Sequence, residues 1–68
     1  MFQTITPANA ENFVEETVID DRVLTVARSF MGRWSYGVAN RVGLDLAGGP
    51  ATSQADARAK AARRAAEV

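Results

Sequence analysis

The residues of this sequence whose types and spacing could do chemistry are arginines and aromatics near the middle of the chain. Arg33, Trp34 and Tyr36 lie within four positions, and Arg28 and Arg41 flank them. Arginine, tryptophan and tyrosine dominate the energetics of protein–protein interfaces, and they also stack on unpaired nucleic-acid bases. The alternative in so short a chain is that Trp34 and Tyr36 fill the core while the arginines stay exposed. The segment is therefore a candidate partner-binding surface.

A second group of candidates is acidic and precedes the first. Its members are Glu15, Glu16, Asp20 and Asp21. Carboxylates of this kind could bind a divalent cation through oxygen, but their spacing is not that of a calcium-binding loop. A solvated strand edge and turn is the alternative. We predict no metal site here and interpret the four residues as an electrostatic patch for a basic partner.

A third group is basic and lies near the C-terminal end. Its members are Arg58, Lys60, Arg63 and Arg64. These side chains could contact the phosphates of a nucleic acid, which would make binding fall steeply with added salt. The glycine-rich stretch 48–53 lacks the lysine of a phosphate-binding loop, and Asp56 would repel anions there. We interpret that stretch as an ordinary loop and helix cap.

Composition excludes several classes of function. The 68 residues contain no histidine and no cysteine, so a Ser-His-Asp triad, a thiolate nucleophile and a zinc site with these ligands are ruled out. We predict a protein that is not an enzyme and needs no cofactor. The sequence has no apolar run of membrane-spanning length and no secretory pattern after its first residue. A cytoplasmic location is the expectation.

Charge is unevenly distributed although the formal net charge is zero. Residues 1–21 carry five carboxylates and no cation, whereas residues 22–68 carry eight cations and three carboxylates. In one interpretation the two parts fold together and neutralise each other. In the other they leave a dipolar surface that docks on a charged partner.

Alternating apolar residues predict a sheet that positions these groups. We expect strands over 12–19 and 22–30 joined by a turn at Asp20-Asp21, then a strand over 34–38. An odd-length loop, 31–33, unites the large apolar residues on one face, pairing Phe30 with Trp34 and Arg28 with Tyr36. A turn at 40–43 and a short strand at 44–46 follow, and the run 47–50 (Ala-Gly-Gly-Pro) predicts a break.

The C-terminal segment predicts a helix over 54–67. Together with its N-cap residue, this helical segment spans 53–67. Ser53 and Asp56 form a capping box. The sequence further predicts ion pairs Asp56–Lys60 and Arg63–Glu67 on one stripe and an alanine stripe packed on the sheet, formed by Ala55, Ala59, Ala62 and Ala66. Large sheet residues would fill the space left by these alanines.

The predicted fold is a single α+β domain over 1–68, in which three or four antiparallel strands carry the C-terminal helix on one face. Residues 1–12 are poorly determined. Phe2 and Ile5 could begin a short strand, and Thr6-Pro7 could open one or two turns of helix.

The C-terminal helix resembles that of double-stranded-RNA-binding domains, whose pattern is Ser-Lys-Lys-x-Ala-Lys-x-x-Ala-Ala-x-x-Ala. The matching positions are Ser53, Ala57, Arg58, Ala61, Ala62 and Ala65. Gln54 and Ala55 stand where that family has its two phosphate-gripping lysines, so the resemblance implies only Arg58 as a phosphate contact. It covers about 20 residues and implies the α-β-β-β-α order of that family.

In size and lack of catalytic residue types, the chain is also similar to the small sheet-plus-helix proteins of phages and mobile elements, including anti-CRISPR proteins. This similarity implies a non-enzymatic inhibitor that blocks a larger complex, such as a CRISPR effector nucleoprotein, by covering its surface. It also implies a location in the host cytoplasm. A nucleic-acid-binding module and a self-associating structural protein, such as a homodimer, are the alternatives. No membrane partner is expected.

Overall fold

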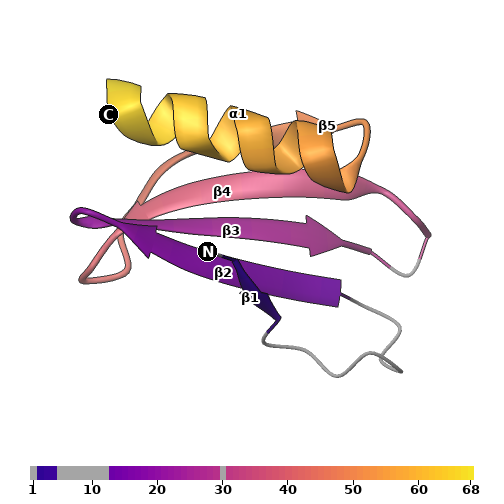
Figure 1. The fold of residues 1–68 in the computed structure, drawn as a ribbon, viewed down its shortest axis with the longest axis horizontal. Coiled ribbons are helices and arrows are strands. Elements are labelled where there is room, and N and C mark those ends of the chain that lie inside the picture. Colours follow the sequence, from indigo (N-terminus) through magenta and orange to yellow (C-terminus); the bar gives the residue numbers. More distant parts are fainter. Residues whose placement is uncertain (1, 5–12, 30) are drawn as a thin grey trace.

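The described part of the chain, residues 2–4, 13–29 and 31–68 of a computed structural model, forms one antiparallel sheet followed by one helix (Figure 1). The five strands are hydrogen-bonded in chain order. Their bounds are β1 (Gln3–Thr4), β2 (Phe13–Ile19), β3 (Arg22–Arg28), β4 (Trp34–Asn40) and β5 (Asp45–Ala51). The α+β class is confirmed, with five strands in place of three or four. The predicted helical turn after Thr6 lies outside the described residues.

Helix α1 (Gln54–Glu67) has the predicted bounds. Two reciprocal hydrogen bonds cap its first turn. The Ser53 hydroxyl oxygen accepts a hydrogen bond from the Asp56 N–H at 3.1 Å. The Asp56 carboxylate in turn accepts from the Thr52 N–H at 3.0 Å. Two N–H groups that the helix itself cannot satisfy are thus paired.

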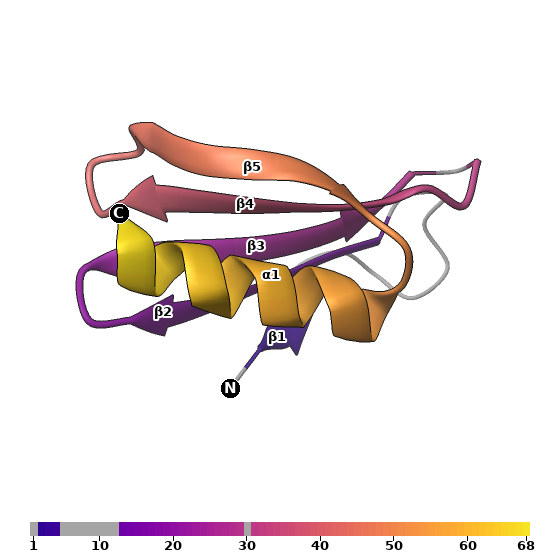
Figure 2. The ribbon, with the colours of Figure 1, turned by 90° about the horizontal axis from the view of Figure 1, so that it is seen from above.

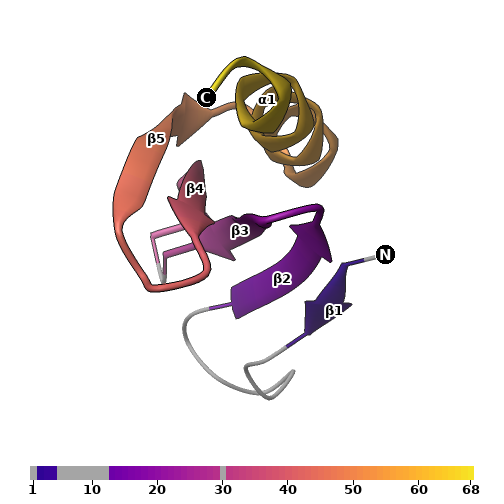
Figure 3. The same ribbon diagram turned by 90° about the vertical axis from the view of Figure 1, so that its left-hand side faces the viewer.

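The helix crosses one face of the curled sheet (Figures 2 and 3). Ala57 and Ala61 are fully buried against it, and Ala65 packs on the same cluster. The predicted stripe was wrong: Ala55, Ala59, Ala62 and Ala66 are all exposed. A helix with alanine on most sides does not specify which side faces inward, and here the inward side also carries Gln54 and Arg58.

The core lies between the helix and the central strands. Leu24, Val26 and Val38 are each at most 1% exposed. They sit at alternate positions of β3 and β4, as expected for strands with one buried face. Burying a leucine or valine contributes roughly 1.5–3 kcal/mol. Tyr36 is half-buried and packs on this cluster, so the interpretation of Tyr36 as a core residue describes it better than that of an exposed anchor.

The turns between strands explain how the faces are aligned. Asp20, at φ 55°, belongs to the predicted two-residue turn between β2 and β3. Between β3 and β4 the Ser29 N–H donates to the Arg33 carbonyl at 2.9 Å, and Gly32 has φ 81°. The odd length of the connection is therefore confirmed, but the connection is displaced by one residue toward β3, because Arg33 lies opposite Ser29.

This one-residue displacement shifts the β3–β4 register by two residues from the prediction. Trp34 pairs with Arg28, and Tyr36 pairs with Val26, so the predicted pairs of Trp34 with Phe30 and of Tyr36 with Arg28 were wrong. Because a shift of two keeps every side chain on its face, Val26, Tyr36 and Val38 still share one face as predicted, whereas Phe30 lies outside the described residues.

Strand β5 runs through the sequence that predicted a break. Gly48 pairs with Gly37, and a side chain at Gly48 would begin 3.1 Å from the Tyr36 carbonyl oxygen. Glycine at this position therefore permits the close approach of β5 to β4. Pro50 is tolerated because β5 is an edge strand. Lys60 Nζ also donates to the Pro50 carbonyl at 3.4 Å, and both features blunt this edge against pairing with another chain.

Candidate protein-binding surface

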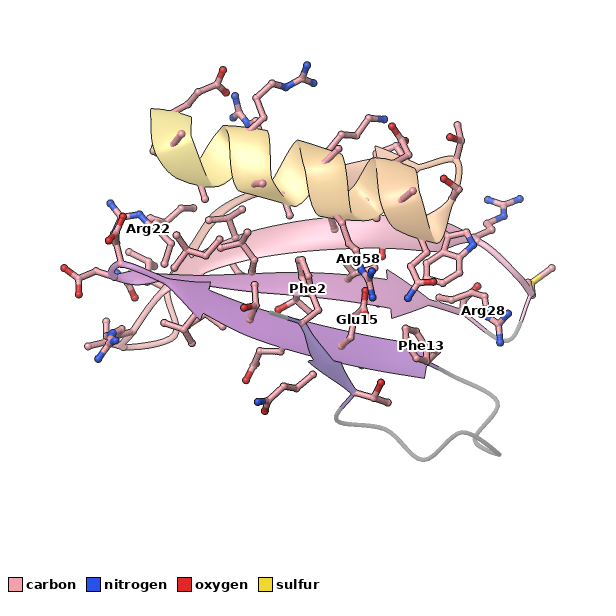
Figure 4. The ribbon with its side chains drawn as sticks, viewed as in Figure 1. Phe2, Phe13, Glu15, Arg22, Arg28 and Arg58 are labelled. Carbon is pink, nitrogen blue, oxygen red and sulfur yellow. The ribbon has the colours of Figure 1, made fainter. Side chains whose placement is uncertain are left out.

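Three of the predicted binding residues gather at the β3–β4 hairpin end of the sheet. Arg28 ends β3, Trp34 begins β4 directly opposite it, and Arg33 precedes Trp34. On the other side, Arg28 pairs with Phe13 of β2. Together, Phe13, Arg28, Arg33 and Trp34 form what we call the arginine–tryptophan surface. Figure 4 shows Phe13 and Arg28 at this end of the sheet.

The aromatic rings of this surface are held in place by contacts on the sheet. The Phe13 and Trp34 ring centroids are 5.9 Å apart with an interplanar angle of 70°, an edge-to-face arrangement. The Arg28 guanidinium carbon lies 5.7 Å from the Trp34 ring centroid, within cation–π range. Trp34 is half-buried while Arg28 and Arg33 are exposed. A partner would therefore meet a pre-positioned ring with the Arg28 cation over it and the Arg33 cation one residue before it in the chain.

A groove of about 570 Å³ runs along this end of the sheet. Its walls include all four residues of the arginine–tryptophan surface together with Pro50. Neither Arg28 nor Arg33 has a carboxylate within 4.0 Å in the described ranges. The groove thus combines an apolar lining with two positive charges that no described side chain neutralises.

Glu15 does not belong to any exposed acidic patch, contrary to prediction. It is 2% exposed and faces the helix. Arg58 Nε and Nη2 donate to its two carboxylate oxygens at 2.6 and 2.7 Å, and Gln54 donates at 3.2 Å. The Arg58 hydrogen bonds hold the pKa of Glu15 below its ordinary value despite burial. The same contact raises the pKa of Arg58.

Arg58 is consequently occupied and not available as a free phosphate contact. Its guanidinium carbon also lies 5.2 Å from the Phe2 ring centroid. Arg58 therefore contacts both Glu15 on β2 and Phe2, the residue before β1 (Figure 4). The arginine that resemblance to RNA-binding domains singled out therefore has a structural role. It joins the acidic first part of the chain to the basic second part.

Arg41 directly follows β4, the strand that Trp34 begins, so it lies at the opposite end of the sheet from Trp34. Its Nε is 3.7 Å from an Asp21 carboxylate oxygen, and its Nη2 donates to the Asp20 carbonyl at 3.5 Å. Both partners are largely exposed, so this ion pair contributes less than about 1 kcal/mol. The structure therefore separates Arg41, Asp20 and Asp21 from the arginine–tryptophan surface. Glu16 lies on the sheet face away from the helix.

The remaining basic candidates, Lys60, Arg63 and Arg64, also lie along α1. Lys60 and Arg64 each form an ion pair with a carboxylate of the same helix. Lys60 pairs with Asp56 at 3.1 Å, as predicted. Glu67 pairs with Arg64 at 2.9 Å in place of the predicted Arg63. Within the described ranges Arg63 has no ion pair, so it alone of the four phosphate candidates keeps an uncommitted charge.

Phe13 is the member of the surface that the sequence analysis missed. The signal was present, because a two-residue turn at Asp20-Asp21 fixes the β2–β3 pairing and places Phe13 opposite Arg28. Extending that register along both strands would have found it.

Comparison with known proteins found nothing similar: no protein-family model, curated protein or solved structure matches the chain. In the parts of the chain that the structure describes, no helix has the length and apolar character needed to cross a membrane. Those parts also hold no group of three or more acidic residues placed to bind a metal ion.

Proposed function

We propose that this protein is a non-enzymatic binding module that docks on a larger protein through the arginine–tryptophan surface. The observation that carries the proposal is the row Phe13–Arg28–Trp34, in which an exposed arginine lies over a half-buried tryptophan and has no counter-ion among the described residues. Tryptophan and arginine are the most frequent residues at interface hot spots, where they act from well-packed positions. The edge-to-face contact with Phe13 supplies such packing before any partner arrives.

The role we propose is inhibition of a larger assembly by occupation of its surface in the cytoplasm, of which an anti-CRISPR protein is the concrete case. A chain of 68 residues without histidine or cysteine has few means of chemistry. It can nevertheless cover a standard interface of about 800 Å² per partner, because its total accessible surface is 4561 Å². To block a larger assembly in this way, the protein needs only affinity for the assembly and a rigid binding surface. The sheet provides the rigid surface.

Affinity capture from a nuclease-treated cell lysate tests this function. Four baits are compared: the wild type, the double variant Arg28→Glu/Arg33→Glu, the double variant Arg28→Gln/Arg33→Gln, and the control Arg63→Glu. The control reverses the charge of an exposed arginine on the helix that has no ion pair within the described residues. We expect a stoichiometric protein band with the wild type and the control that both double variants lose.

Two outcomes would contradict the proposal. One is a partner that all four baits retain equally, which would place the interface elsewhere. The other is recovery of nucleic acid from untreated lysate together with loss of every protein band after nuclease treatment, which would favour a nucleic-acid-binding module.

A further inference from the structure

The structure contains two arginines stacked on aromatic rings, and only one of them has a carboxylate in the described ranges. Arg58 lies 5.2 Å from the Phe2 ring centroid, and Arg28 lies 5.7 Å from that of Trp34. Arg58 also donates two hydrogen bonds to Glu15. Arg28 makes no corresponding contact there.

The Arg58 site shows what a stacked arginine does in this fold. A guanidinium that lies over a ring keeps the N–H groups along its edge free, and these match the two oxygens of a carboxylate. At Arg58 both contacts occur together, with oxygens at 2.6 and 2.7 Å. The Arg28 site repeats the ring and the cation, and no carboxylate of the described residues lies within 4.0 Å of its donors.

We propose that the groove beside Arg28 binds a glutamate or aspartate carboxylate of the partner, carried on a segment with apolar neighbours. This inference rests on the proposed function and adds the chemistry of the ligand. Arg28 would bind the carboxylate through paired hydrogen bonds, and Arg33 would add a second charge from the same groove. Flanking aliphatic side chains of the segment would pack on the Phe13 and Trp34 rings.

Two features favour a carboxylate on a protein over a nucleic-acid phosphate. The described residues supply two cations to the groove, whereas nucleic-acid binding typically draws on many phosphate contacts. Much of its lining is apolar, with Phe13, Val14, Ala27, Trp34 and Pro50 among the walls, which suits aliphatic side chains more than a charged backbone.

The test is a titration followed by ¹H–¹⁵N NMR. Trp34 is the only tryptophan of the chain, so its indole N–H gives a unique signal, and the Arg28 Nε–H reports the guanidinium. The probes are the capped peptide Gly-Leu-Glu-Leu-Gly, its glutamine counterpart, inorganic phosphate and a thymidine hexanucleotide. We expect both signals to shift with the glutamate peptide, and its affinity to exceed that of the glutamine peptide by about tenfold or more, as for other hydrogen bonds to charged groups.

Matched variants distinguish the contribution of the paired guanidinium donors from that of the positive charge. Arg28→Lys keeps the charge but loses the paired donors, so we expect it to weaken binding of the glutamate peptide by about tenfold, whereas Arg63→Lys leaves it unchanged. The variant Glu11→Gln tests whether Arg28 already binds a carboxylate of this chain, because Glu11 lies outside the described residues. If that variant shifts the Arg28 signal without peptide, the chain supplies its own carboxylate and the inference is overturned.

Equal affinity for the two peptides, or tighter binding of the hexanucleotide or phosphate, would also overturn the inference. The proposed function would still stand if capture of the partner depended on Arg28 and Arg33. Conversely, a partner captured without regard to these arginines would remove the function even if the peptide bound.

Discussion

The carboxylate of Glu15 on strand β2 accepts two hydrogen bonds from the guanidinium of Arg58 on helix α1, across 43 residues of sequence. Glu15 is almost fully buried, whereas the Arg58 side chain is 44% exposed. Desolvation of such a pair offsets much of its attraction. Its clearest effect is specificity, because it fixes which side of an alanine-rich helix faces the sheet.

Substitution of Glu15 by glutamine should destabilise the protein. The change keeps the shape but removes the charge that Arg58 and Gln54 contact, and the loss should be roughly 1–3 kcal/mol, the range for hydrogen bonds to charged groups. Glu16→Gln is the matched control, since Glu16 faces away from the helix and should change stability by less than about 0.5 kcal/mol. Urea unfolding followed by tryptophan fluorescence measures both. Equal midpoints for the two variants would contradict the structural role of Glu15.

Stability should fall in acid, and mainly through the same residue. The Arg58 hydrogen bonds lower the pKa of Glu15 in the folded state, and the Thr52 N–H and Lys60 lower that of Asp56. A carboxyl with a lowered folded pKa stabilises the protein above its unfolded pKa, about 4. That stabilisation is lost as the pH falls through the folded pKa.

Urea midpoints at pH 7, 5, 4 and 3 measure this loss. Glu15→Gln should show a smaller decline than the wild type, because it has nothing to protonate at that position. Parallel declines for the two proteins would show that other groups control acid unfolding.

How far the sequence predicts this fold depends on whether the governing signal is local. The helix bounds follow from Ser53 and Asp56, which lie three residues apart, and the β2–β3 turn follows from Asp20-Asp21. The run Gly48-Gly49-Pro50 predicted a break because these residues are weak strand formers. The backbone of the neighbouring strand, whose Tyr36 carbonyl oxygen would lie 3.1 Å from a side chain at Gly48, makes glycine suitable there, and an edge position makes proline tolerable. Neither fact is visible locally.

The candidate site divides in the same way. Trp34 and Arg28 could be selected from residue type, and the structure places them side by side. Arg58 suggested phosphate binding because its partner, Glu15, is 43 residues away and reads as an exposed acid in isolation. Arg41 was grouped with Trp34 by proximity in sequence, although the strand between them carries it to the far end of the sheet.

Two glycines, Gly37 on β4 and Gly48 on the edge strand β5, should respond oppositely to substitution. A side chain at Gly37 would meet no atom within 4 Å, so Gly37→Val should be neutral or stabilising by up to about 1 kcal/mol, since valine favours strands. A side chain at Gly48 would begin 3.1 Å from the Tyr36 carbonyl oxygen, so Gly48→Ala should destabilise by roughly 1 kcal/mol. Thermal unfolding compares them. A more stable Gly48 variant would mean that β4 and β5 are paired differently.

The β4–β5 hairpin should depend on the left-handed residue in its loop. Gly43 has φ 92°, and the Asn40 side chain accepts from the Val42 and Leu44 N–H groups at 3.1 and 2.9 Å. Gly43→Ala should cost roughly 1–2 kcal/mol, the penalty for an L-residue in this region. Denaturant midpoints measure the cost, with Gly37→Ala as the control of ordinary φ. If Gly43→Ala and Gly37→Ala both unfold at the wild-type denaturant midpoint, the positive φ of Gly43 is contradicted.

The central claim is that a protein partner contacts the Arg28–Trp34 end of the sheet, and the most direct measurement is the Trp34 indole ¹H–¹⁵N signal on addition of the purified captured partner. We predict that this signal shifts or broadens in proportion to complex formation. We also predict that the same partner leaves the Arg28→Glu/Arg33→Glu variant unperturbed. An indole signal that stays in place while backbone signals of α1 shift would contradict the account and move the interface to the helix.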